Sequence, residues 1–291
     1  MAADVGQGFA VCLCNPQGFA HAGALREVAE TLHWGLVDAG FESTHVENQF
    51  LEGRLNIVMA PHLLVHFPGW DSRGTENMVL FNFEQIREEL IAQIPYYPSI
   101  LARCRVWDYD RRNVDALKAL GVERVQHVRV GFAAQMTRVD HAADQDIDVL
   151  FYGSPSARRL KLRDELLARG LVTEFVFGVY GAQRDAMISR AKLVVNPGVY
   201  ETGGLFDIVR LSYLLTNRKA VVMEKGIDPE QEARFDAGVC FATIDEMADE
   251  CVYLCAVEDE RRELADRGYA LFSATPQGGL MKSAIAGLGE P

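Results

Sequence analysis

The stretch Asp148-Val149-Leu150-Phe151-Tyr152-Gly153-Ser154 determines how the second half of the chain folds. It is a short apolar run that stops at a glycine, and a helix-length segment at 156–169 follows it. An apolar run of this length, bounded by a turn signal, is typical of a strand buried in a parallel sheet. We therefore expect a strand at 148–152, a turn at Gly153 and then a helix.

The order of strand and helix repeats through the rest of this half. Short apolar runs rich in β-branched residues predict strands at 174–177, 193–196, 220–223 and 239–241. Amphipathic segments predict helices at 182–191, 206–215, 245–256 and 260–273. Alternating strands and helices build a parallel sheet with helices on both faces, so this half is expected to form a Rossmann-like lobe.

The first half shows the same pattern. An apolar helix face runs from Leu25 to Leu36, with Gly40 placed to end the helix, and another helix is expected at 110–120. Apolar runs predict strands at 9–13, 43–46, 56–60, 78–82, 105–107 and 125–130. The chain is thus predicted to be α/β, with one architecture built twice.

Lobe boundaries follow from a change in polarity after Gly131. The stretch 132–146 is polar and breaks the strand–helix pattern, which predicts a linker. The expected organisation is a first lobe at 1–131, that linker, a second lobe at 147–275 and a C-terminal tail at 276–291.

Composition excludes several functions. A formal net charge of −12 argues against binding to a nucleic-acid backbone, which needs a basic surface. No apolar run approaches the ~20 residues of a membrane span, and 1–8 lacks the features of a secretory signal. The 6 cysteines have no zinc-site spacing, so we expect free thiols, no metal and a cytoplasmic location.

Cations gather directly after the strand at 148–152. Arg158 and Arg159 open the predicted helix, shortly after Gly153 and Ser154. A helix N-terminus offers free N–H groups and partial positive charge, so cations are unfavourable there unless an anion is bound. The pattern predicts a diphosphate at this turn; the alternative is a solvated first turn beside a structural glycine.

A second polar segment, Asn196-Pro-Gly-Val-Tyr-Glu-Thr-Gly-Gly-Leu-Phe-Asp207, follows the strand at 193–196. Adjacent glycines before a helix suit a loop that wraps a ligand and presents N–H groups. Asp207 and Arg210 then share one side of an otherwise apolar helix; a surface ion pair between them is the alternative. The residues expected to contact a ligand are Asn196, Glu201, Gly203, Gly204, Asp207 and Arg210.

These segments resemble the nucleotide-binding lobe of GT-B glycosyltransferases, in particular small bacterial members of glycosyltransferase group 1. In that class a strand–glycine–basic segment holds the donor diphosphate, an acidic glycine loop contacts the sugar, and a later carboxylate holds the ribose. The resemblance implies two Rossmann-like lobes facing across a cleft. Gly153, Arg158 and Arg159 match the first element, and Glu201, Gly203, Gly204 and Asp207 approximate the other two.

In the first half the resemblance implies an acceptor side at the strand ends. His21, in the loop that contains Gly18, is a candidate general base because an imidazole with a pKa of ~6.5 accepts a hydroxyl proton at neutral pH. His62 is an alternative candidate for the general base on the same reasoning, and Glu84 is a third candidate, with a carboxylate in place of the imidazole. Asp108 either faces the same cleft as a catalytic group or caps the following helix.

The sequence therefore predicts a glycosyltransferase. It would move a sugar from a nucleotide-diphosphate sugar to a hydroxyl acceptor, whether a glycan, a lipid-linked acceptor or a small molecule. Arginines and helix N-termini would stabilise the leaving diphosphate in place of a divalent metal, and no cofactor is expected. The alternative is a non-catalytic nucleotide or nucleotide-sugar-binding protein. A dinucleotide enzyme is disfavoured, because no Gly-x-Gly-x-x-Gly follows a predicted strand.

Overall fold

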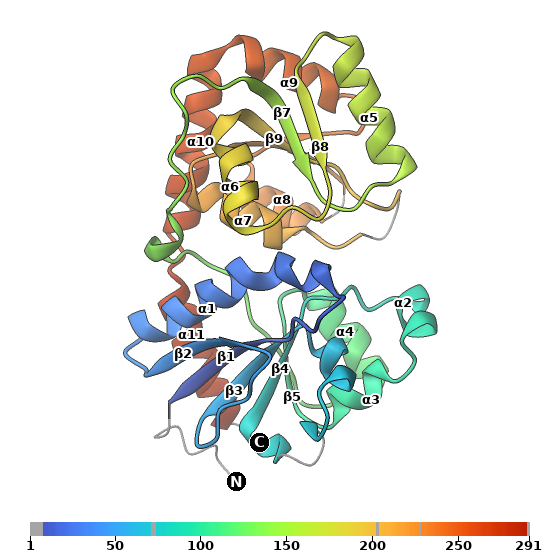
Figure 1. The fold of residues 1–291 in the computed structure, drawn as a ribbon, viewed down its shortest axis with the longest axis vertical. Coiled ribbons are helices and arrows are strands. Elements are labelled where there is room, and N and C mark those ends of the chain that lie inside the picture. The colour runs from blue at the N-terminus through green and yellow to red at the C-terminus, as the bar shows by residue number, and fades with distance from the viewer. Residues whose placement is uncertain (1–7, 71–73, 202–203, 227, 290–291) are drawn as a thin grey trace. The chain divides into compact units, whose positions relative to one another are not determined.

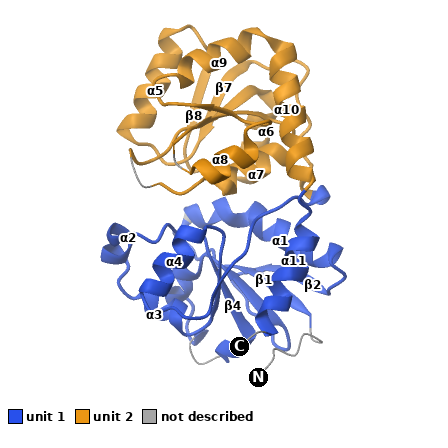
Figure 2. Cartoon of the chain, turned by 180° about the vertical axis from the view of Figure 1, so that it is seen from behind, with its two compact units in different colours: residues 1–135, 275–291 blue, residues 136–274 orange. Residues whose placement is uncertain are grey.

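The computed structural model describes residues 8–70, 74–201, 204–226 and 228–289. The chain divides into two compact units (Figure 2): one comprises Met1–Gln135 and Thr275–Pro291, and the other comprises Met136–Ala274. Each unit is a parallel sheet covered by helices, so the predicted pair of Rossmann-like α/β lobes is confirmed.

The first unit contains a six-stranded sheet in the order β2-β1-β3-β4-β5-β6, with every neighbouring pair parallel (Figure 1). Its central strands β1, β3 and β4 are buried along their whole length, which explains their continuous apolar runs. The strands are β1 Phe9–Leu13, β2 Ser43–Glu47, β3 Leu55–Met59, β4 Met78–Asn82, β5 Arg105–Asp108 and β6 Val125–His127.

Helices of the first unit are α1 Arg26–Asp38, α2 Glu88–Gln93, α3 Tyr97–Ala102, α4 Arg111–Ala119 and α11 Gln277–Ala286. The last of these lies where a C-terminal tail was expected, and it packs along α1. The approach is close: a Cβ on Gly35 would lie 2.3 Å from Cγ of Gln277. Residues 277–286 therefore belong to the core of the first unit.

The second unit contains a five-stranded parallel sheet in the order β11-β10-β9-β7-β8. The strands are β7 Ile147–Tyr152, β8 Thr173–Val176, β9 Ala191–Asn196, β10 Ala220–Glu224 and β11 Cys240–Ala242. All five were predicted within two residues of their bounds. Because all run in one direction, Tyr152, Asn196 and Glu224 end at the same edge of the sheet.

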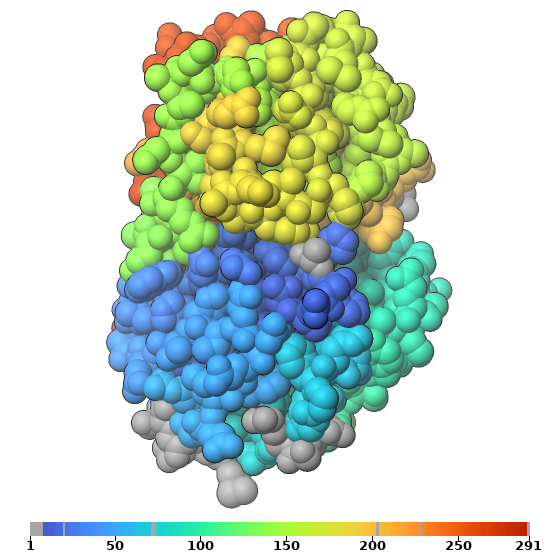
Figure 3. Space-filling model, in the orientation of Figure 1, coloured from blue at the N-terminus to red at the C-terminus, as the bar shows by residue number. Residues whose placement is uncertain are grey.

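Helices cover both faces of this sheet. They are α5 Ala157–Ala168, α6 Gly181–Arg190, α7 Ile208–Thr216, α8 Pro229–Phe235, α9 Met247–Ala256 and α10 Glu258–Ser273. Alternate strand residues such as Val149, Leu193 and Val222 pack with α5, α9 and α10 in one core. The residues between them point to the other face, where α6 contacts β7 and β9 (Figure 1) and forms part of the surface seen in Figure 3.

The predicted linker at 132–146 is divided between the units: 132–135 belong to the first unit and 136–146 to the second. Asn217, buried at the end of α7, accepts hydrogen bonds at its Oδ1 from the backbone N–H groups of Arg138 (2.8 Å) and Val139 (2.9 Å). Ala134–Met136 forms one short 3-10 helix. A local polar cluster therefore anchors the chain where it enters the second unit. No helix within the described ranges has the length and apolar character to span a bilayer.

Candidate functional site

Three arginines meet at the carboxyl edge of the second sheet, and the first, Arg158, is paired with Glu224. Both guanidinium Nη groups bond the two carboxylate oxygens of Glu224, the last residue of β10. The same carboxylate accepts the N–H of Gly198 at 2.8 Å, and the hydrogen-bonded pairing raises the pKa of Arg158. Glu224 was not predicted, although an acid at the end of an apolar strand was the available signal. The pair fixes Arg158 over the strand ends.

Arg159 is buried and holds the neighbouring loops. It is 6% exposed, its Nε and Nη2 donate to the carbonyl of Pro197 at 3.0 and 2.8 Å, and its Nη1 donates to the carbonyl of Ser154 at 2.8 Å. Its guanidinium also lies over the ring of Phe151, 4.8 Å from the centroid. Burial, with Arg210 nearby, lowers its pKa to about 10, so it stays charged at neutral pH. Arg159 ties the β7 and β9 loops together.

Arg210 lies behind the turn at Gly153. Its Nη1 bonds Asn196 and lies 2.9 Å from Oδ2 of Asp207, while its guanidinium faces the rings of Phe151 and Tyr152. Among the described residues, Nε of Arg210 and Nδ2 of Asn196 are buried with no hydrogen-bond acceptor. Buried donors without acceptors are costly, at ~1–3 kcal/mol each, and a ligand that supplies acceptors would explain why they are kept here.

Gly153 is required at this turn for two reasons. Its φ of +152° is a backbone conformation that residues with a Cβ rarely adopt. A Cβ here would also lie 2.7 Å from Nη2 of Arg210. The glycine thus leaves room for the guanidinium directly behind the end of β7, as a turn that admits a ligand would need.

The remaining predicted donor residues surround these arginines. Asp207 is the N-cap of α7, and its carboxylate accepts from the N–H of Arg210 at 3.2 Å. Ser156 caps α5 in the same way. Ser154 and Glu201 are exposed, and Gly204 is half-buried; Gly203 lies outside the described residues. Two capped helix N-termini therefore accompany the arginine cluster.

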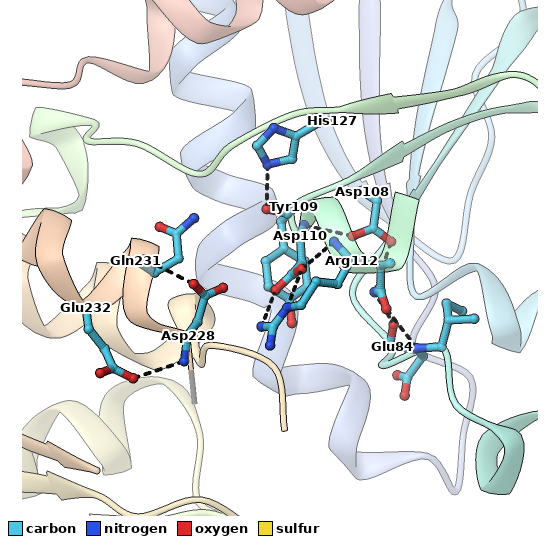
Figure 4. A network of polar contacts seen from close by, with 11 residues as sticks. Glu84, Asp108, Tyr109, Asp110, Arg112, His127, Asp228, Gln231 and Glu232 are labelled. Carbon is cyan, nitrogen blue, oxygen red and sulfur yellow. Dashed lines mark hydrogen bonds and ion pairs between the residues drawn. The ribbon is translucent and has the colours of Figure 1, made fainter. Parts of the chain in front are cut away.

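The first unit carries a different network at its own carboxyl edge (Figure 4). Asp108 is fully buried at the end of β5 and accepts hydrogen bonds from the side chains of Asn82 (2.6 Å) and Asn113 (3.1 Å) and the N–H of Asp110 (2.9 Å). Burial raises its pKa to about 7 against the lowering effect of these bonds. Asp108 has no open face for a substrate, and the cap of α4 is Asp110 rather than Asp108.

This network supports the Glu84 segment. The side-chain amides of Asn82 and Asn113 both donate to the carbonyl of Glu84 at 2.8 Å, and Tyr97 donates to Oδ1 of Asn82 at 2.7 Å. The backbone of Glu84 is therefore fixed, while its side chain is left partly exposed. Buried amide networks of this kind rigidify what they hold.

Glu84 and His62 form a pair. Oε1 of Glu84 lies 3.4 Å from Nδ1 of His62, an ion-pair distance without hydrogen-bond geometry. Burial lowers the pKa of His62, and the nearby Glu84 carboxylate partly opposes that shift. His62 is thus a neutral imidazole at pH 7 with a carboxylate beside it, which is the composition of a general base and its orienting group.

The other predicted residues of the first unit lie on exposed backbone. Gly18 has a φ of +92° with open space around it, and His21 is exposed in the 3-10 helix Ala20–Leu25. Figure 4 also draws Asp228 and Glu232, which belong to the second unit and cap α8. His62 and Glu84 are the two first-unit candidates that lie at ion-pair distance from each other.

The architecture built by these two sheets is the GT-B glycosyltransferase fold. The chain is similar to T4 phage BGT in complex with its UDP-glucose substrate, with a TM-score of 0.62, 10% identity, and coverage of 96% of this chain and 98% of that one. It is also similar to Anabaena Alr3699/HepE in complex with UDP-glucose, with a TM-score of 0.61, 12% identity, and coverage of 96% and 98%.

A third similar structure is longer. TarM matches with a TM-score of 0.55 and 12% identity. The match covers 80% of this chain and 54% of TarM. No protein-family model and no curated protein sequence matches the chain. The TM-scores of 0.55–0.62 show a common fold, and at 10–12% identity the activity has to be argued from the site.

Proposed function

We propose that this protein is a glycosyltransferase that uses a nucleotide-diphosphate sugar as donor and a hydroxyl group as acceptor. The observation that carries the proposal is the arginine cluster at the carboxyl edge of the second sheet, where Arg210 and Asn196 keep buried donors without acceptors. Ligands of open parallel sheets bind at that edge. Two solved structures with the same fold hold UDP-glucose, so UDP-glucose is the first donor to test.

In this proposal the donor diphosphate lies beside Gly153 and the N-termini of α5 and α7. Arg210 and Arg158 supply positive charge there, in the part that a divalent metal plays in many other glycosyltransferases. Glu201 and Gly204 lie on the loop that leads to α7 and are assigned to the sugar. Arg159 is assigned a positioning role, because three of its donor groups already hold backbone carbonyls.

The chemistry needs a base for the acceptor. The acceptor oxygen bonds to the anomeric carbon, the bond from that carbon to the diphosphate oxygen breaks, and the hydroxyl proton goes to the base. We assign the base to His62, with Glu84 orienting it and stabilising the imidazolium that forms. Asp108 is assigned a supporting role, through the amides that hold the Glu84 backbone. His21 is retained only as an exposed loop residue near the acceptor side.

Calorimetric titration with UDP and UDP-glucose, followed by an assay for UDP release, tests the proposal. A transferase binds UDP and releases it slowly from UDP-glucose by hydrolysis, and faster once an acceptor is added. Binding without any release would favour the non-catalytic nucleotide-sugar-binding protein. No binding of any nucleoside diphosphate in a wider screen would remove the proposed function.

A further inference from the structure

The second unit has a further pocket, at the amino end of its sheet and therefore at the edge opposite the proposed donor site. The pocket has a volume of about 490 Å³ and is lined by 141–145, the starts of β9 and β10, and the first turns of α10. Small-molecule sites typically have volumes of ~300–1,000 Å³. Its size suits a compact metabolite.

The lining is strongly cationic. Five of its side chains are basic, namely Lys192, Arg218, Lys219, Arg261 and Arg262, against the two carboxylates of Asp144 and Glu258. The whole chain carries a net charge of −12. A basic pocket within an acidic protein concentrates anions locally even though the overall field repels them.

Lys219 is the most unusual of these residues. It is 1% exposed, and its Nζ donates to the carbonyl of Ala191 at 2.5 Å. Within the described part of the chain no carboxylate lies at ion-pair distance from it, whereas fully buried lysines are almost always paired. Burial and the nearby Arg261 lower its pKa to about 7. An ammonium in this position lacks a counter-ion.

Arg261, beside Lys219, is also a buried cation. It is 7% exposed, and its Nη1 donates to the carbonyls of Leu254 (2.7 Å) and Cys255 (3.2 Å) at the end of α9. Nε and Nη2 have no hydrogen-bond partner among the described residues, and no described carboxylate pairs with the guanidinium. The other three cations do have carboxylate partners: Lys192 with Asp148, Arg218 with Asp266, and Arg262 with Glu258.

We propose that this pocket binds a phosphate dianion, free or carried by a small metabolite, between Lys219 and Arg261. Two adjacent buried cations without counter-ions match a ligand of charge −2. A phosphate supplies the several acceptor oxygens that an ammonium and a guanidinium together can engage. The site is separate from the proposed donor site, and the proposal does not depend on glycosyl transfer.

The test is a titration of the full chain with inorganic phosphate and with glycerol 3-phosphate, by calorimetry and by thermal unfolding at constant ionic strength. Both anions should bind and raise the midpoint, and chloride should not. Tighter binding of glycerol 3-phosphate would identify a phosphate ester as the ligand, and equal binding would identify the phosphate group itself. Lys219→Met should weaken binding by about 10–100-fold, the loss expected for one charged hydrogen bond.

Three further variants keep the test decisive. Lys282→Met, on α11 of the first unit, removes one exposed positive charge and should leave phosphate binding unchanged. Arg163→Met, at an exposed cation on α5 of the second unit that pairs with Asp164, should also leave it unchanged, which excludes a nonspecific effect of charge. Should Lys219→Met fail to fold, Arg262→Gln provides the test with a loss of about 3–10-fold, because its cation lines the pocket from the surface. Phosphate binding no stronger than chloride binding, or full retention in the folded pocket variants, would overturn the proposal.

Discussion

The carboxyl edge of the sheet in the second unit is built from guanidinium groups, whereas the same edge in the first unit is built from amides, carboxylates and an imidazole. Arg158, Arg159 and Arg210 cluster in the second unit, where Arg158 pairs with Glu224 and Arg210 with Asp207. In the first unit, by contrast, Asp108 supports Glu84 beside His62. The two sheets thus carry different side chains at equivalent edges. In the proposed function the edge of the second unit binds the anion, and the edge of the first unit takes up the proton.

The largest effect is expected at the imidazole of the first unit. His62→Ala should lower kcat/KM by about 10²–10⁴-fold, the usual contribution of a general base. The acid limb of the pH profile should lie below pH 6.5, because burial lowers the pKa of His62. Glu84→Gln should move that limb to still lower pH, since Glu84 raises the pKa.

His66→Ala is the matched control for that measurement, because His66 ends the same short helix and is exposed. It should leave the rate nearly unchanged. An unaltered pH profile in both His62→Ala and Glu84→Gln would show that these two residues take no part in proton transfer.

The next effect concerns the arginine edge. Arg210→Met should reduce turnover by about 10²–10³-fold. This is the usual loss when one hydrogen-bond donor that stabilises negative charge in the transition state is removed. Arg163→Met is the control, since Arg163 is exposed on α5 and pairs only with its neighbour Asp164. Steady-state rates with UDP-glucose, at matched thermal stability, would measure the difference. Equal rates for the two variants would exclude Arg210 from the site.

A third prediction concerns the pH dependence of stability at the edge of the first unit, where Asp108 is buried. The folded-state pKa of Asp108 is about 7, above the ~3.9 of an unfolded aspartate, so its stabilising contribution is complete below pH 4 and lost as pH rises through 7. Relative to Asp108→Asn, the wild type should lose about 2–3 kcal/mol of unfolding free energy between pH 5 and pH 8.

Tryptophan fluorescence is a selective probe for this measurement, because Trp34, Trp70 and Trp107 all lie in the first unit. Urea unfolding of both proteins at each pH gives the difference directly. Parallel pH dependence in wild type and Asp108→Asn would show that the carboxyl keeps an ordinary pKa.

The smallest effect is expected at the turn behind Arg210. Gly153→Ala adds a Cβ in a conformation that alanine rarely adopts, 2.7 Å from Nη2 of Arg210. It should destabilise the second unit by about 1–2 kcal/mol and weaken UDP binding by about tenfold, because the guanidinium must move. Gly170→Ala, at a φ of +82° with open space around it, controls for backbone strain alone. Equal UDP affinity in the two variants would dismiss the steric argument.

Much of the fold could be predicted from local sequence. Buried parallel strands such as β7 and β9 are continuous apolar runs, so five or six consecutive residues are enough to predict where each strand lies. The helix α11 was missed because its burial depends on Gly35 of α1, more than two hundred residues away in the sequence. Local patterns do not encode such contacts.

For the candidate site, the sequence predicted which residues lie at the strand ends but not which groups they bind. The sequence identifies Arg158 and Arg159 as cations at a helix start. Their partners, Glu224 at the end of β10 and the carbonyl of Pro197, lie far from them in the sequence. The same limit applies to Asp108, whose hydrogen-bond partners Asn82 and Asn113 come from other parts of the first unit. Spacing along the chain gives an arginine its position, and tertiary packing determines whether its charge is still open to a ligand.

We propose that the arginine edge of the second unit binds a nucleoside diphosphate, and a crystal structure of the full chain with UDP would show where the nucleotide lies. We expect the diphosphate within hydrogen-bond distance of Arg210 and beside Gly153 at the N-terminus of α5. Density for UDP at the amino end of the sheet, with the environment of Arg210 unchanged, would contradict it.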